Sequence, residues 1–393
     1  MELARSQAVD WLLNSKIHNL DPSEKESFGG FNNYYDLRKK KCEYVYTEIT
    51  AYSVELLLDL FQRTGSNTYL EEAKLAGDWI VKMQDESGGF LWKNNLSDGS
   101  YSSETFSFDT AICIGALVDL YLRTDCTKYL QAADKGSEWL VDVMYNADGS
   151  FKPSYNVESG TFVTSRTKLP FPKNLSMRKT WFRFSGCHHG KISIGLLKLY
   201  VVKKDSILLD VVRRLCSWTM KQQDAQGYFR VTPGSTCSFS HTHCYATEGL
   251  LYAYGHLGSQ LFLDAAIKAL RWLIAIQRED GSIPDWFNSG NPIPSVDTSA
   301  VAQAIRLWSI LYRKTGKKIY NAALRKAMGY LMSTQHICPG EESSGGFYLA
   351  EFDLKFIKYR IKRLYSWPTI FTIHALNLIE DMTSKQISEI DLW

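Results

Sequence analysis

The sequence predicts a single all-α domain over residues 1–393, an (α/α)6 barrel of six helical hairpins, on three observations. A glycine turn recurs six times along the chain. A helix with one large aromatic residue precedes each turn, and a more apolar helix follows it. The repeat length of about 60 residues exceeds that of an open tetratricopeptide superhelix. Twelve helices that alternate in this way are expected to close into an outer and an inner ring.

The glycine turns give the most visible sign of the repeat. Three clear copies begin at Gln84, Gln222 and Gln277, and weaker copies span residues 27–31, 146–151 and 344–348. Glycine ends a helix readily because its backbone can adopt the left-handed conformation that a sharp turn needs.

The helices before the turns are predicted to form the outer ring. Their apolar residues recur at three- and four-residue spacing, as an amphipathic helix requires. Each carries an aromatic residue at the same place, and these residues are Trp11, Trp79, Trp139, Trp218, Trp272 and Tyr330.

The helices after the turns are apolar nearly all round, so we expect them to be buried as the inner ring. Their predicted starts lie near Glu48, Asp109, Gly190, Tyr245, Asp297 and Pro368. Proline suits the first turn of a helix because its missing N–H would have no partner there.

The third unit is longer than the others. An insertion at about residues 152–188 contains Trp181, Phe182 and Phe184. Because long loops in compact domains are usually functional or disordered, we predict that this insertion forms a lid over one mouth of the barrel.

Polar and aromatic residues gather around the predicted starts of the inner helices. In a closed barrel these starts share one mouth, so their side chains should converge into a polar, ring-lined pocket. The residues are Tyr44, Tyr46, Glu48, Phe108, Asp109, Cys187, His188, His189, His241, His243, Tyr245, Asp285, Trp286, Asp297, Tyr365 and Trp367.

The carboxylates carry the strongest chemical prediction. Glu48 and Asp109 occupy equivalent places in neighbouring hairpins by the sequence pattern. Glycoside cleavage uses two carboxyl groups, one of which must stay protonated to reach the leaving oxygen. We therefore predict catalytic roles for Asp109, Glu48 and Asp297. The alternative for Asp109 and Asp297 is helix N-capping, since each precedes a threonine at a helix start.

The histidines and the rings complete the predicted site. His189 and His243 are candidate acids or bases near neutral pH, with a polar rim position as the alternative. The predicted substrate-binding residues are Tyr44, Tyr46, Trp92, His188, His241, Trp286, Tyr365 and Trp367, where rings stack on sugar faces or, alternatively, pack the loops. Cys187 and Cys244 offer thiols beside these histidines, but no tetrahedral ligand set is fixed, so we predict neither a metal nor a cofactor.

Composition and absent motifs exclude several classes. The 45 basic and 42 acidic residues nearly balance, which gives no nucleic-acid footprint. The sequence has no apolar run long enough for a membrane span and no signal-peptide pattern at its start, and its eight cysteines show no C-x-x-C pair. We therefore predict a cytoplasmic protein without a nucleic-acid partner, and the carboxylates and rings described above predict a carbohydrate partner. Phosphate-loop, dinucleotide and esterase-elbow motifs are absent.

Three segments carry a family resemblance: residues 46–84, 108–130 and 296–320. They resemble the six-hairpin glycosidase superfamily, and most closely a poorly characterised branch found with polysaccharide-synthesis enzymes. The segment FDTAICIGAL, which starts at Phe108, is similar to the part of unsaturated uronyl hydrolases that carries the acid/base aspartate. The resemblance implies that Asp109 is the acid/base and Glu48 the second carboxyl. In those enzymes the second carboxyl is an aspartate in a different local sequence.

Other barrel families match less well. Sugar 2-epimerases carry a histidine three residues before a glutamate, whereas Tyr245 stands at that spacing before Glu248. The glycine turns resemble those of terpene cyclases, but the Asp-x-Asp-Asp run of those enzymes is absent.

The predicted function is therefore a carbohydrate-active enzyme that cleaves or remodels a glycan, including one that contains uronate, through glycoside hydrolase chemistry. The alternatives are a polysaccharide lyase with Tyr46 or His189 as base, a sugar epimerase and a non-catalytic glycan-binding toroid. A further alternative is an enzyme on the same fold that acts on isoprenoids, or one that uses zinc to act on peptides.

Overall fold

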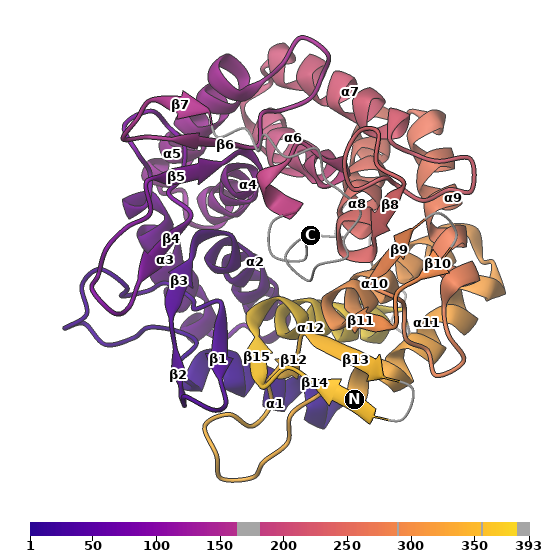
Figure 1. Cartoon of the computed structure of the whole chain (residues 1–393). Coiled ribbons are helices and arrows are strands. Elements are labelled where there is room, and N and C mark those ends of the chain that lie inside the picture. The colour runs from indigo at the N-terminus through magenta and orange to yellow at the C-terminus, as the bar shows by residue number, and fades with distance from the viewer. Residues whose placement is uncertain (163–180, 289–290, 355–356, 383–393) are drawn as a thin grey trace.

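The computed structural model describes residues 1–162, 181–288, 291–354 and 357–382. It confirms the predicted (α/α)6 barrel. Figure 1 shows the helices in two concentric rings, with the strands and loops around the starts of the inner helices.

The outer ring follows the predicted amphipathic pattern. In α3, the buried residues Ala73, Ala76, Trp79 and Ile80 recur at three- and four-residue spacing, so that one stripe faces inward. All six predicted aromatic residues are buried. The outer helices are α1 (Glu2–Asn14), α3 (Asn67–Lys82), α5 (Thr127–Glu138) with the π-helical turn η1 (Trp139–Met144), α7 (Ser206–Lys221), α9 (Gln260–Ile276) and α11 (Lys318–Met332).

The inner helices are buried on almost every side, as predicted. Each contacts the next one round the ring, and α12 contacts α2, so the inner ring is closed. They are α2 (Thr47–Thr64), α4 (Ser107–Thr124), α6 (Ile192–Lys203), α8 (Ser240–Leu257), α10 (Thr298–Thr315) and α12 (Ser366–Asp381).

Two inner-helix starts differ from the prediction. Helix α8 begins at Ser240, five residues before Tyr245, so His241 and His243 lie inside its first turn rather than ahead of it. The third inner helix begins with a 3-10 segment, η4 (Cys187–Lys191), before α6 continues. In both units polar residues fill the first turn, and an apolar pattern alone does not show such a turn as helical.

The glycine turns dock each hairpin on the next outer helix. Gly88 has a φ of +110°, and a Cβ there would lie 2.5 Å from the carbonyl oxygen of Lys135 in α5. Gly345 has a φ of +112°, and its Cβ would lie 2.1 Å from the carbonyl oxygen of Gln7 in α1. Only glycine fits such a backbone conformation and such a close approach.

The turn glutamines strengthen the same junctions. Gln84 Nε2 donates to the carbonyls of Gly88 and Ala132, both at 2.9 Å. In the turn after α7, the equivalent bonds are made by Gln223. The predicted turn began one residue earlier, at Gln222. Gln335 donates to the carbonyl of Ala4 at 2.9 Å, and this bond joins the last turn to the first helix.

Short antiparallel strands precede most of the inner helices, and they form small sheets along one rim. They are β1 (Tyr34–Asp36), β2 (Lys41–Cys42), β3 (Tyr44–Tyr46), β4 (Lys93–Asn95), β5 (Glu104–Phe106), β6 (Ser154–Asn156), β7 (Thr161–Phe162), β8 (Cys237–Phe239), β9 (Trp286–Asn288), β10 (Asn291–Pro292), β11 (Ser295–Asp297), β12 (Phe347–Tyr348), β13 (Ala350–Leu354), β14 (Ile357–Arg360) and β15 (Arg363–Tyr365). The longest pair is β13 with β14, and the next longest are β3 with β4, β5 with β6, β8 with β9, β11 with β13 and β1 with β15.

Backbone bonds set the inner helices in register at this rim. The first residue of each of five of them donates its N–H to a carbonyl in the next unit round the ring. These bonds run from Thr47 to Trp92 at 3.1 Å, Ser107 to Pro153 at 3.1 Å, Ser240 to Asp285 at 2.7 Å, Thr298 to Leu349 at 2.7 Å and Ser366 to Asn33 at 3.0 Å. The starts therefore share one rim, as the site prediction requires.

Residues 163–180 of the predicted lid lie outside the described residues, so the lid stays a prediction. At its end, Trp181–Arg183 form a short 3-10 turn against the rim. Among the helices in the described ranges, none combines the length and apolar character needed to cross a bilayer.

Candidate functional site

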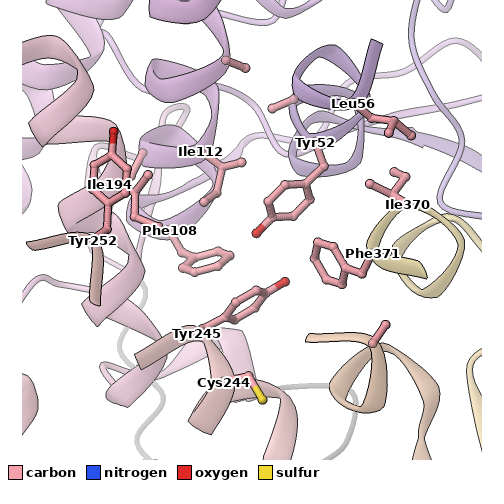
Figure 2. Close-up of a cluster of buried hydrophobic side chains, with 14 of the residues drawn as sticks. Tyr52, Leu56, Phe108, Ile112, Ile194, Cys244, Tyr245, Tyr252, Ile370 and Phe371 are labelled. Atoms are coloured by element: carbon pink, nitrogen blue, oxygen red, sulfur yellow. The ribbon is translucent and has the colours of Figure 1, made fainter. Parts of the chain in front are cut away.

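The second residue of an inner helix faces the barrel axis. In α2, α4, α8, α10 and α12 this residue is Glu48, Phe108, His241, Ser299 and Trp367. Four residues further along three of these helices stand Tyr52, Tyr245 and Phe371, which Figure 2 shows pointing toward one another across the axis. The Phe108 and Tyr245 ring centroids lie 4.9 Å apart, and those of Tyr52 and Phe371 lie 5.1 Å apart.

Seven side chains at and just below the starts of the inner helices form what we call the central cluster. Tyr245 Oη donates to Glu48 Oε1 at 3.3 Å, and its ring centroid lies 4.4 Å from that of His241. The cluster consists of Tyr46, Glu48, Asp109, His188, His241, Tyr245 and Trp367, all from the predicted mouth.

The carboxyl pair lies in this cluster with one correction to the prediction. Glu48 is the second residue of α2, but Asp109 is the third residue of α4, so Phe108 is the true equivalent of Glu48. The offset turns Asp109 by about 100° round its helix. Even so, the two carboxyl groups are close enough that the charge of Glu48 raises the pKa of Asp109.

Burial makes both carboxyl groups hard to ionise. Glu48 is 2 % exposed and Asp109 is 1 % exposed. Burial raises the pKa of Glu48 to about 7, although Trp367, Lys191 and nearby tyrosines pull the pKa down. Burial first, and the charge of Glu48 second, raise the pKa of Asp109 well above its usual value. Both carboxyl groups therefore hold a proton more tightly than exposed carboxyl groups do, and the protonation of one depends on that of the other.

For Asp109 and Asp297, helix N-capping was the alternative to a catalytic role, and the hydrogen bonds show which of the two caps its helix. Asp297 Oδ1 accepts from the N–H of Ser299 at 2.9 Å and of Ala300 at 3.3 Å, so it is the N-cap of α10. Asp109 lies inside α4, and Phe106 stands at the N-cap. Asp109 Oδ2 has no hydrogen-bond partner among the described residues. Capping thus accounts for Asp297 and does not account for Asp109.

His241 is connected to the Asp297 cap. Ser299 Oγ lies 2.9 Å from His241 Nδ1 and also donates to Asp297 Oδ1. With the serine proton directed at the carboxylate, the serine oxygen accepts from His241 Nδ1–H. Such a chain fixes the orientation and the tautomer of the imidazole.

The other histidines fall into two groups. His188 and His189 are fully buried, their ring centroids lie 4.4 Å apart, and none of their ring nitrogens has a partner among the described residues. Burial lowers the pKa of His189 to about 3 and that of His188 well below its usual value, so both are neutral. His243 is elsewhere: Phe229 N–H donates to its Nδ1 at 3.1 Å, and its Nε2 lies 3.2 Å from the Ala269 carbonyl.

The predicted acid/base role of His243 therefore has no geometric support. Both its nitrogens hold backbone groups of a turn and an outer helix, at a position where α2 and α4 use Thr50 and Thr110 for the same contact.

The predicted rings mostly gather around Tyr46. Its ring centroid lies 5.7 Å from that of Trp92 and 5.6 Å from that of Trp367, edge to face in both cases. Tyr44 lies beside Trp92 at 6.0 Å, and Tyr365 stacks on Trp367 at 6.5 Å. These rings form a continuous aromatic wall at the rim.

Trp286 is the exception among the predicted rings. It stacks on Phe239 with centroids 4.8 Å apart, in a separate cluster with Val231 and Cys237. The two cysteines near the histidines are buried thiols, and each donates to a backbone carbonyl: Cys187 to Thr242 and Cys244 to Ala300.

A second polar layer lies one to two turns below the carboxyl pair, and the sequence reasoning missed it. Lys191 Nζ lies 2.7 Å from Glu248 Oε2, and Arg306 Nη1 lies 3.4 Å from Glu248 Oε1. Lys191 Nζ also lies 4.7 Å and 4.6 Å from the ring centroids of Tyr52 and Tyr245. Spacings of four and seven residues from the rim, as in His241, Tyr245 and Glu248, are the signal that could have revealed this layer.

The rings of helices and the polar rim define an (α/α)6 toroid of the six-hairpin glycosidase type. The family model of the squalene-hopene cyclase C-terminal domain matches residues 60–376, and the chain belongs to this family. The Asp-x-Asp-Asp run that we expect of terpene cyclases is nevertheless absent from the sequence. No curated protein sequence matches the chain.

Several solved structures share the fold. A cellobiose 2-epimerase from Bacillus thermoamylovorans superposes with a TM-score of 0.75 at 14 % identity, covering 96 % of this chain and 100 % of that one. An unsaturated glucuronyl hydrolase specific for heparin gives 0.67 at 12 %, covering 99 % and 98 %. A GH76 α-mannanase from Bacteroides thetaiotaomicron gives 0.52 at 14 %, covering 88 % and 73 %. These structural neighbours are carbohydrate-active enzymes, and at such identities the likeness concerns the fold.

Proposed function

We propose that this protein is a carbohydrate-active enzyme that cleaves a glycosidic bond with Asp109 as proton donor and Glu48 as its partner carboxylate. The observation that carries the proposal is the buried pair itself: two carboxyl groups from neighbouring inner helices, both with raised pKa values, at the ring-lined rim of a toroid.

The environments of the two carboxyl groups suit different tasks. Burial and the charge of Glu48 favour the protonated form of Asp109, which is the form that can protonate the oxygen of the leaving sugar. Glu48 has a pKa of about 7, and the nearby ammonium of Lys191 favours its ionised form. An ionised Glu48 can activate a water or face the positive charge that develops on the sugar ring.

The surroundings suit a sugar better than a hydrocarbon. Tyr46, Trp92 and Trp367 offer ring faces and edges at the rim, which pack against the C–H faces of sugars. Below them lie the charged side chains of Lys191, Glu248 and Arg306, which a cyclase for a purely apolar substrate would leave unused.

A sugar epimerase is the second candidate. His241, held by Ser299 and 4.4 Å from the Tyr245 ring, is the observation that favours it, because epimerisation next to a carbonyl needs a positioned base. A lyase is less well supported, since it needs a tyrosine or histidine base and no acidic pair.

The test is a screen of the purified chain against neutral and uronate-containing oligosaccharides. New reducing ends report hydrolysis, a new unsaturated end reports elimination, and chromatography of the sugars reports epimers. We expect reducing ends that are lost in Asp109→Asn and Glu48→Gln and kept in Asp98→Asn, an exposed turn residue. Turnover that persists in both carboxyl variants would refute the assignment, and epimers without hydrolysis would favour the second candidate.

A further inference from the structure

The last glycine turn is longer than the clear copies of the same turn. In all three clear copies, a glutamine side chain donates to the carbonyl of the glycine four residues later, as Gln84 does to Gly88. Gln335 makes the same bond to Gly345, ten residues later. The turn therefore holds six additional residues, although it docks on α1 in the usual way.

The additional residues bring three metal-ligating side chains together. His336, Cys338 and Glu341 each offer one ligand atom, and these three atoms lie within 4.8 Å of one another. An imidazole, a thiolate and a carboxylate are all ligands of zinc. In a tetrahedral zinc site such atoms are about 3.5 Å apart, so closure by about 1 Å completes the geometry.

Neighbouring groups already hold these side chains in place. Tyr348 Oη lies 2.9 Å from His336 Nδ1, and the tautomer with its proton on Nδ1 donates to it and leaves Nε2 free to bind a metal. Ser343 Oγ lies 3.3 Å from that Nε2 and donates to Glu341 Oε2 at 3.2 Å. Outer partners of this kind orient metal ligands and raise metal affinity.

We propose that His336, Cys338 and Glu341 form a Zn²⁺ site, with water as the fourth ligand. On binding, the Cys338 thiol gives its proton to solvent and forms the Zn–S bond, His336 Nε2 and a Glu341 oxygen donate their lone pairs, and no electron is transferred. The site is independent of the carboxyl pair.

The site has a structural role because of where the turn sits. Gln335 and Gly345 attach this turn to Ala4 and Gln7 of α1, which is the junction that closes the ring. Metal that ties His336 to the additional residues stiffens this turn, so zinc stabilises the closure between the last and the first hairpins.

Zinc binding to the whole chain tests the proposal. The protein, purified without a histidine tag and stripped of metal, is titrated with Zn²⁺ by calorimetry and with Co²⁺, whose visible spectrum reports thiolate and tetrahedral coordination. We expect one equivalent to bind and the thermal midpoint to rise with Zn²⁺. Cys338→Ser and Glu341→Gln should each weaken binding by about 100-fold or more and remove the thermal shift.

Cys126→Ser is the matched control, because Cys126 is the other partly exposed cysteine of the described chain and lies elsewhere. It should bind zinc like the parent. Glu341 is exposed, so its variant keeps the test valid if Cys338→Ser folds poorly. Absence of binding in the parent, or equal binding in the parent and both ligand variants, overturns the proposal.

Discussion

Glu48→Gln should stabilise the protein while it slows the proposed reaction. The side chain is fully buried in the barrel centre, and its pKa of about 7 compares with an ordinary value of 4.5. Ionising this group in the folded protein at pH 7 therefore costs about 3 kcal/mol. Glutamine has nearly the same shape and no charge, so it avoids this cost.

The direction in which the free energy of unfolding changes with pH follows from proton binding by Glu48. The folded state holds the Glu48 proton more tightly than the unfolded state does, so stability from this group is complete below about pH 4.5 and is lost as pH rises through about 7. Glutamine does not titrate. Between pH 5 and pH 8 the parent should therefore lose about 2.5 kcal/mol more of its free energy of unfolding than Glu48→Gln does.

Urea unfolding followed by tryptophan fluorescence at pH 5, 6, 7 and 8 measures this difference. Glu71→Gln, on the exposed side of α3, is the control and should follow the parent at every pH. If the parent and Glu48→Gln lose stability in parallel across this range, Glu48 does not have the raised pKa of a buried carboxyl group, and the buried pair that carries the proposed function is lost.

Three further predictions test the site and the ring, one of them with a matched control. Asp109→Asn should lower glycan turnover by about 10²- to 10⁴-fold with little change in calorimetric binding, and equal loss of both would contradict a proton-transfer role. Gly345→Ala should lower the free energy of unfolding by about 3 kcal/mol, through backbone strain and the contact with α1. Gly316→Ala, also at positive φ but with open space around it, should cost only about 1 kcal/mol, and equal costs in urea unfolding would contradict the docking argument. Ser299→Ala should free the His241 ring, and it should change the pH profile of kcat more than the pH profile of KM. If the serine has only a structural role, the pH profile of kcat will stay unchanged.

The ring architecture could be predicted because its signals are local and repeated. Three- and four-residue apolar spacing marks the outer helices, and the turns need glycine where they meet the next helix backbone, as at Gly88. The start of α8 could not be placed in the same way. Its first turn is polar, and Ser240 in that turn donates hydrogen bonds to the carbonyls of Pro284 and Asp285, which lie far along the chain.

The site was predictable as a region and less so in detail. Helix starts in register gathered Glu48, Asp109 and the rings of Tyr46 and Trp367, since register follows from the repeat. The one-residue offset of Asp109 could not be predicted, because α4 begins at Ser107 and nothing in the local sequence marks that residue as the first of the helix.

Two other details depended on partners that the sequence does not reveal. Lys191 was overlooked because a lysine in an apolar helix has meaning only once Glu248 is known to face it. The role of His243 depends on the backbone of Phe229, which no pattern of side chains shows.

The bond from Gln335 to Ala4 gives every hairpin a neighbour on both sides. Open stacks of repeats need specialised end units, and they can fray from those ends. A closed circle has no end unit from which fraying could start, so one hairpin can leave only if two junctions break together. The molecule should therefore resist piecemeal melting, and cutting the chain within an exposed loop should harm it far less than removing α1.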